Sequence, residues 1–273
     1  MSDGTSRQES QQQMSPAHEP GGAAPRHPVA AATAAAGAFI KNAAMGMLHL
    51  VRHGQARFAS EDYDRLSELG QRQCHALGRW YAARGQRFGA VLTGTLTRHR
   101  QSLAALGEGL GALPAALESA ALNEYDSEAL LRAARAEPTL APPEPLPAPT
   151  TPEGYRAHFR LLRQALAAWT AGTLAVPGLP PHAEWRAGIA TVLDHVRTRC
   201  EGDVLLVSSG GPIATATAMV MGAPGDAWIE LNLRLRNSAL TEFSVSPKRP
   251  VLHSFNTLPH LGAPEHVDWV TYA

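Results

Sequence analysis

The sequence predicts an α/β fold in which a mainly parallel β-sheet is covered by helices on both faces. Short apolar runs of strand length alternate along the chain with longer segments whose apolar residues recur at helical spacing. This alternation indicates parallel strands, because a helix between two strands returns the chain to the edge at which it began. The strand-like runs are almost wholly apolar, which is typical of strands that are buried on both faces.

The predicted elements follow one another in a regular order. They are a strand at 47–52, a helix from Ser67 to about Arg84, a strand at 90–93, a helix at 96–110, helices at 155–170 and 185–200, a strand at 203–208, a helix at 212–221, and strands near 239–245 and 250–255. Ser67 is suited to cap the first helix, and hydroxyl side chains are expected to cap the helix at 96–110. Pro212 is expected to occupy the first position of its helix.

Two segments depart from this alternation. Residues 1–45 are rich in Gln, Ser, Pro and Ala and lack apolar periodicity, so we expect a disordered tail ahead of a domain at 46–273. Residues 134–152 are rich in proline and are expected to form an extended surface loop. Together with the helix that follows, this loop is expected to belong to an insertion at about 127–180.

The composition excludes several classes of function. The formal net charge is zero and the isoelectric point is about 7.2, so we expect no nucleic acid partner and no membrane partner. No apolar run reaches the roughly 20 residues that span a bilayer. Cys74 and Cys200 lie far apart, which argues against a disulfide scaffold and a zinc site and favours a cytoplasmic protein without metal or cofactor. Because the only lysines are Lys41 and Lys248, an anion site in this chain would use arginine.

The first candidate for chemistry is Arg52-His53-Gly54, at the end of the first strand. Open α/β sheets bind ligands at the carboxyl ends of their strands. Arginine supplies a fixed positive charge, and histidine supplies an imidazole that is neutral and nucleophilic near pH 7. The pair therefore suits a phosphate, although a histidine at a strand end is also commonly a packed structural residue.

Three later segments strengthen the phosphate hypothesis. Arg98 lies in the first turn of a helix that follows the second strand, where an anion is favoured. Ser209 and Gly210 follow the strand at 203–208 and precede a helix, so their backbone N–H groups could cradle an anion. Glu124 could donate a proton to a leaving oxygen.

With these segments together, the chain resembles the histidine phosphatase superfamily, also called the phosphoglycerate mutase-like family. The matching motifs are Leu50-Val51-Arg52-His53-Gly54-Gln55, Asp64 to Gln73, Leu96-Thr97-Arg98 with Gln101-Ser102, Leu122-Asn123-Glu124, Ser208 with Gly210-Gly211, and Phe255-Asn256 with His260-Leu261. The resemblance implies a three-layer α/β/α sandwich with His53 as the covalent nucleophile and Glu124 as the proton donor. It also implies that Arg52, Arg98, Ser209 and Gly210 bind the phosphoryl group.

The chain departs from the family pattern at one central position. Ser209 stands where the family usually has a second histidine, and the residues after the first turn, Arg57 to Ser60, lack the usual asparagine. Because adjacent side chains on a helix point about 100° apart, we expect His99 to face away from the pocket that Arg98 lines.

We therefore expect a phosphomonoesterase that forms a phosphohistidine and acts on a small phosphorylated metabolite or a phosphoprotein. Two alternatives remain open. One is a non-catalytic or strongly slowed module that binds phosphorylated ligands, and the other is a phosphoglycerate mutase. The oligomeric state is left open by the sequence.

Overall fold

The computed structural model describes residues 46–57, 64–142, 147, 151–246 and 248–272, and every structural statement below concerns these residues. The tail predicted at 1–45 lies outside them. Residues 58–60, which belong to the segment without the family's usual asparagine, also lie outside them.

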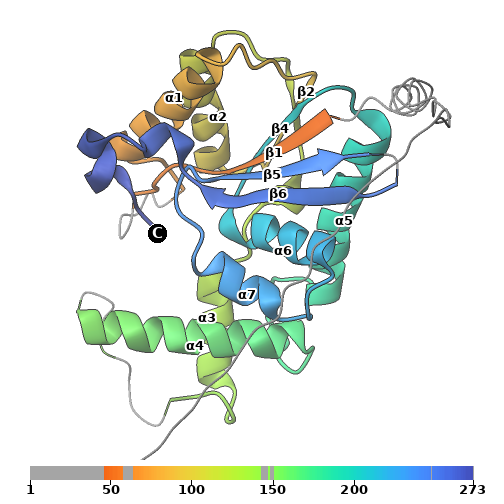
Figure 1. Cartoon of the computed structure of the whole chain (residues 1–273). Coiled ribbons are helices and arrows are strands. Elements are labelled where there is room, and N and C mark those ends of the chain that lie inside the picture. The colour runs from red at the N-terminus through yellow and green to blue at the C-terminus, as the bar shows by residue number, and fades with distance from the viewer. Residues whose placement is uncertain (1–45, 58–63, 143–146, 148–150, 247, 273) are drawn as a thin grey trace, which may run out of the picture. The chain divides into compact units, whose positions relative to one another are not determined.

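Six strands form one sheet in the order β3-β2-β4-β1-β5-β6 (Figure 1). They are β1 (Gly46–Arg52), β2 (Ala90–Thr93), β3 (Ala116–Glu118), β4 (Val204–Ser208), β5 (Leu240–Val245) and β6 (Pro250–Thr257). The four strands from β3 to β1 run parallel, whereas β5 is antiparallel to β1 and to β6. The sheet is therefore mainly parallel, as predicted. Strand β3 was not predicted from the sequence, because its three residues are all exposed and show no apolar pattern.

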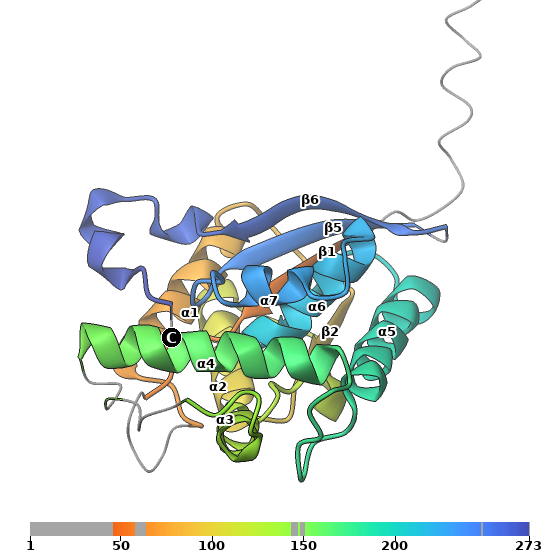
Figure 2. The ribbon, with the colours of Figure 1, turned by 90° about the horizontal axis from the view of Figure 1, so that it is seen from below.

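Helices cover both faces of the sheet, which confirms the predicted three-layer sandwich (Figures 1 and 2). The helices are α1 (Glu68–Ala82), α2 (Thr97–Leu110), α3 (Ser127–Ala136), α4 (Pro152–Thr170), α5 (His182–Arg199), α6 (Gly210–Met221) and α7 (Ala227–Asn232). One layer contains α1 and α2, and α5, α6 and α7 lie on the other side of the sheet. Within the predicted insertion, the chain forms α3 and α4, of which only α4 was expected.

The sheet separates two hydrophobic cores, and β4 contributes to both. Leu205 and Val207 pack toward α1 and α2, whereas Val204 and Leu206 pack into the core under the other helices. Successive side chains of a strand point to opposite faces, so a strand buried on both sides must be apolar throughout. All five residues of β4 are buried, which explains its uninterrupted apolar sequence.

Two predicted helix starts are wrong in detail. The N-cap residue of α2 is Leu96, and its side chain makes no capping hydrogen bond. The carboxylate of Asp64, which lies outside the helix, accepts the Thr97 N–H instead. The helix α6 begins at Gly210, so Pro212 is its third residue and Ser209 is its N-cap. In both cases a contact from elsewhere in the fold meets the N–H groups at the helix start, and sequence patterns do not record such contacts. Ser67 caps α1 as predicted, by accepting the Gly70 N–H at 3.0 Å.

No helix of the described residues is long and apolar enough to cross a membrane. Cys74 and Cys200 are both free thiols.

Candidate active site

The site is built around His53, which directly follows β1 and is only 5% exposed. Its Nδ1 lies 2.7 Å from the carbonyl oxygen of Gly54. A carbonyl only accepts, so Nδ1 carries the proton and the lone pair is on Nε2. Burial, with the positive charges of Arg98 and Arg52, lowers the pKa of His53 well below its usual value. His53 is therefore a neutral imidazole in the tautomer that leaves Nε2 nucleophilic.

The backbone around His53 is held from several distant segments. The His53 N–H donates to Ser208 on β4, and its carbonyl oxygen accepts the Ser238 N–H at 3.1 Å. Next to it, the Gly54 N–H donates to the hydroxyl of Ser102 on α2, and that hydroxyl donates to the Arg98 carbonyl. The turn that presents the imidazole is therefore fixed by β4, by α2 and by the segment before β5.

Arg52 is anchored by the C-terminal part of the chain. Its Nη1 donates to the carbonyl oxygens of Leu235 and Tyr272. These contacts hold the guanidinium beside His53, where it acts on the pKa of the imidazole. Nothing in the local sequence of β1 predicts either partner.

Arg98 is positioned by a carboxylate. Its Nη1 donates to Asp64 Oδ1 at 2.8 Å, and Asp64 Oδ2 accepts the Thr97 N–H at 2.8 Å. Partial burial acts to raise the pKa of Asp64, but the hydrogen bonds from Thr97 and the charge of Arg98 outweigh it and hold that pKa below its usual value. Asp64 is thus an anion that fixes both the guanidinium and the start of α2. This role of Asp64 was not predicted from the sequence.

The side chain of Glu124 contacts the N-terminus of α6. Both of its carboxylate oxygens are 3.1 Å from the backbone nitrogen of Gly211. A Cβ atom at Gly211 would lie 2.2 Å from Glu124 Oε1, so a side chain at this position would displace the carboxyl group. Burial raises the pKa of Glu124, although the Gly211 N–H, Arg98 and Arg52 act to lower it. A carboxyl group with a raised pKa is suited to donate a proton.

Glu124 is also held by its neighbours on both sides. The Asn123 side chain accepts from the Thr95 N–H and donates to the Thr95 hydroxyl, which ties this loop to the end of β2. The hydroxyl of Tyr125 accepts a hydrogen bond from Asn232 at 2.7 Å. The ring of Tyr125 packs in an aromatic cluster made by Tyr125, Trp169, Trp185 and Trp228. The carboxyl group therefore rests on contacts from α4, α5 and α7.

The placement of His99 corrects the sequence prediction. His99 is 0% exposed, and its Nε2 lies 2.6 Å from the Ser209 hydroxyl oxygen. The centre of its ring is 5.7 Å from that of His53. The prediction that it would face away from Arg98's pocket is wrong, because a side chain in the first turn of a helix can extend past the helix end. The ring packs against Gly94, where a Cβ atom would lie 2.1 Å from His99 Nδ1.

The predicted residues thus lie together at the carboxyl ends of β1, β2 and β4. Arg98, Arg52 and His99 act on the pKa of His53, and both arginines act on that of Glu124. Such a set of two guanidinium groups, one neutral imidazole and one protonatable carboxyl group can hold a phosphate ester and transfer its phosphoryl group.

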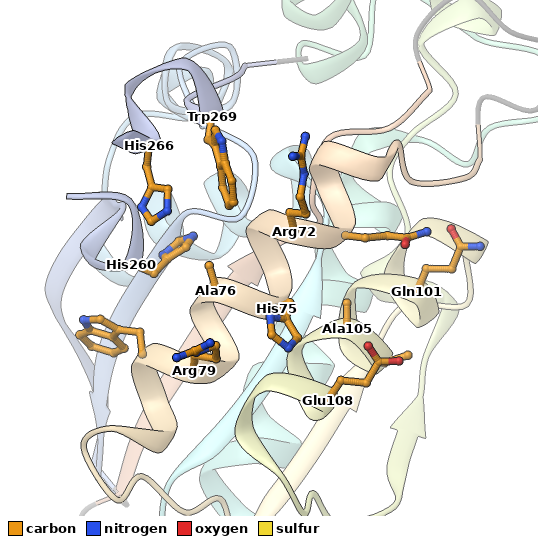
Figure 3. A pocket seen from close by; sticks show the side chains of 13 residues that line it. Arg72, His75, Ala76, Arg79, Gln101, Ala105, Glu108, His260, His266 and Trp269 are labelled. Atoms are coloured by element: carbon orange, nitrogen blue, oxygen red, sulfur yellow. The ribbon is translucent and has the colours of Figure 1, made fainter. Parts of the chain in front are cut away.

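A separate cavity of about 760 Å³ lies on the outer side of α1 and α2 (Figure 3). Arg72 and Arg79 line it from α1, Gln101 and Glu108 from α2, and Trp269 from the C-terminal segment. None of the predicted site residues lines it. It is therefore distinct from the group of residues around His53.

Among the described residues, no three His, Cys, Asp or Glu side chains are grouped so that they could hold a metal ion. The positive charge that surrounds His53 comes from arginine.

The fold and this site define an α/β protein with two arginines, a histidine and a carboxyl group at one end of its parallel strands, and comparison with known proteins gives its family. Residues 48–143 and 150–258 match the histidine phosphatase superfamily (branch 1), so the chain belongs to this superfamily. No curated protein sequence matches the chain.

Two solved structures to which the chain is similar are phosphatases. A mycobacterial glucosyl-3-phosphoglycerate phosphatase with inorganic phosphate has a TM-score of 0.53 and 21% identity, and the match covers 80% of this chain and 100% of that one. A phosphoserine phosphatase mutant from Entamoeba histolytica, in complex with phosphoserine, has a TM-score of 0.51 and 17% identity, with 80% and 100% covered. At these identities the likeness establishes the shared fold.

Proposed function

We propose that the chain is a phosphomonoesterase that transfers the phosphoryl group of its substrate to His53 and then to water. The observation that carries this proposal is the state of His53. Its imidazole is neutral, its Nδ1 proton is fixed on Gly54, and its Nε2 lone pair is available beside two arginines. Such a group is a nucleophile that needs no separate base.

In the first step, His53 Nε2 attacks phosphorus and the bond from phosphorus to the ester oxygen breaks. The leaving oxygen takes its proton from the Glu124 carboxyl group, which the raised pKa keeps available for donation. Arg52 and Arg98 bind the phosphoryl oxygens and offset their charge, which is the main catalytic requirement of phosphoryl transfer.

In the second step, the Glu124 carboxylate takes a proton from water and the water oxygen attacks phosphorus. The bond between phosphorus and Nε2 breaks, inorganic phosphate leaves, and His53 returns to its neutral form. We assign Ser209 and Gly210, at the start of α6, to the binding of the phosphoryl group alongside the arginines.

We propose a small phosphorylated metabolite or a phosphoprotein as the substrate. The structural neighbours support this class, since one is a phosphoserine phosphatase bound to phosphoserine and another is a glucosyl-3-phosphoglycerate phosphatase. A chain of formal net charge zero offers no general attraction for nucleic acid, so the anionic group of the ligand is recognised locally.

The test is hydrolysis of p-nitrophenyl phosphate by the full chain without added metal, with His53→Ala as the comparison. We expect release of phosphate by the wild type and none by the variant. A rapid quench with ³²P-labelled phenyl phosphate should trap a protein-bound phosphate that is stable in alkali and labile in acid. Equal turnover by His53→Ala contradicts the proposal.

Two outcomes identify the alternatives. A wild-type chain that binds orthovanadate and never acquires ³²P is a binding module. A chain that interconverts phosphoglycerate isomers without releasing phosphate is a mutase.

A further inference from the structure

The His99 imidazole lies beside the candidate site residues around His53. It is fully buried, it belongs to a helix whose first turn also carries Arg98, and one of its nitrogens reaches the Ser209 hydroxyl at 2.6 Å. Its ring centre lies 5.7 Å from that of His53. A contact so short, between two wholly buried polar groups, marks a specific hydrogen bond.

The fold makes room for this ring at a particular place. Gly94 lies at the turn between β2 and α2, and any side chain there would meet His99 Nδ1 at 2.1 Å and Asn123 Oδ1 at 2.8 Å. Asn123 in turn precedes Glu124, so the ring fills the space between the end of β2 and the start of α6. Glycine at position 94 is what lets the imidazole approach Ser209.

The surroundings of His99 indicate which nitrogen carries the proton. Nδ1 faces the α-carbon of Gly94 and, within the described residues, has no hydrogen-bond partner. A buried N–H without an acceptor is rarer in proteins than an acceptor without a donor. The proton therefore lies on Nε2, which donates to the Ser209 oxygen, and the hydroxyl proton of Ser209 is left for another acceptor.

Burial, with the nearby charge of Arg98, lowers the pKa of His99 to about 3. The ring is therefore neutral at working pH, with one donor and one acceptor nitrogen. A neutral donor of this kind can orient a hydroxyl but does not add charge to the pocket.

We propose that His99 is a positioning residue that holds the Ser209 hydroxyl so that its proton points at a bound phosphoryl oxygen. The pair, drawn from α2 and from the start of α6, completes the phosphate cradle beside Arg98. This inference rests on the proposed function, because it needs a phosphoryl group beside His53.

The first test is a double-mutant cycle with His99→Leu and Ser209→Ala, read by the affinity of the full chain for orthovanadate. Loss of one preorganised donor to the developing charge of an oxyanion costs about 10²–10³-fold in kcat, and we expect a smaller, roughly tenfold loss in vanadate affinity. The proposal requires that His99→Leu weakens binding in the wild type and has less than a twofold effect in the Ser209→Ala background. Equal effects in both backgrounds overturn it.

The second test separates hydrogen bonding from packing. His99→Gln keeps an N–H donor near the place of Nε2, so we expect it to retain vanadate affinity and kcat within about fivefold, whereas His99→Leu loses kcat more than it changes KM. A His99→Gln variant as impaired as His99→Leu overturns the proposal.

His49→Gln is the matched control. His49 is also a buried histidine with one nitrogen on a hydroxyl, 3.2 Å from Tyr81, but its ring packs among Tyr81 and Phe88. It should change the melting temperature without changing vanadate affinity.

The two proposals fail in different ways. Full turnover by His53→Ala contradicts the phosphohistidine route and leaves the vanadate cycle to decide on His99. A wild-type chain that binds neither vanadate nor phosphate contradicts both.

Discussion

A single methyl group at Gly211 should disable leaving-group protonation. In Gly211→Ala the new Cβ atom would lie 2.2 Å from Glu124 Oε1 and 2.9 Å from the Tyr125 ring. Contacts of that length do not occur, so the carboxyl group must retreat by about 1 Å and lose its hydrogen bonds to the Gly211 N–H. A displacement of this size costs on the order of 10²-fold when it affects a reacting group.

The loss of kcat in Gly211→Ala should depend on the leaving group of the substrate. Phenyl phosphate expels a basic oxygen that needs the proton of Glu124, whereas p-nitrophenyl phosphate expels a stable anion that needs it far less. We expect kcat to fall about 100-fold on phenyl phosphate and less than tenfold on p-nitrophenyl phosphate. Glu124→Gln, which removes the proton without adding volume, should give the same pattern.

Gly107→Ala is the matched control for Gly211→Ala. Gly107 is inside α2, and an added Cβ would meet only Leu113 at 3.4 Å, an ordinary contact. It should leave both activities unchanged and stabilise the fold by about 0.5–1 kcal/mol. A Gly211→Ala protein that melts like the wild type and loses equal activity on both substrates refutes the role given to Glu124.

Three further outcomes are expected. Asp64→Asn should lower kcat/KM about tenfold, or about 1.4 kcal/mol, because Arg98 loses a charge-assisted partner, and steady-state kinetics should show this. The melting temperature should also fall, because the lowered pKa of Asp64 means that its charged form stabilises the fold. Burial lowers the pKa of His99 and of His260 to about 3, so as the pH falls the unfolded chain binds protons at these residues before the folded chain does. The free energy of unfolding should therefore be highest above about pH 6.5 and should fall as the pH drops toward 3. Melting curves of His260→Gln should show a smaller fall over this range. Excess EDTA should leave p-nitrophenyl phosphate hydrolysis unchanged, because arginine supplies the positive charge, and a loss restored by a divalent ion would contradict that assignment.

The sequence by itself predicted the central strands and the edge of the sheet at which the candidate site residues lie. Strands β1, β2 and β4 are apolar on both faces, so their positions follow from burial that each strand expresses locally. Because parallel strands end at one edge, His53 and Arg98 could be placed together from the sequence. The short edge strand β3 and the six-residue helix α7 could not be predicted, since neither is long enough to show a period.

Tertiary structure decided how the side chains of the site are held. The pairing of Arg98 with Asp64, the carbonyls around Arg52 and the seat of Glu124 on Gly211 all join segments that are distant along the chain. A local pattern records propensity and burial, but it does not record which distant atom meets a given polar group.

His99 illustrates the difference most directly. Helical spacing predicted that it would face away from the pocket, yet Gly94 leaves a space and Ser209 provides a partner. Gly94 lies just before α2 and Ser209 is distant along the chain, and helix periodicity describes neither contact. Sequence alone therefore predicted which edge of the sheet carries His53 and Arg98, while only the packed fold placed a second imidazole beside the Ser209 hydroxyl.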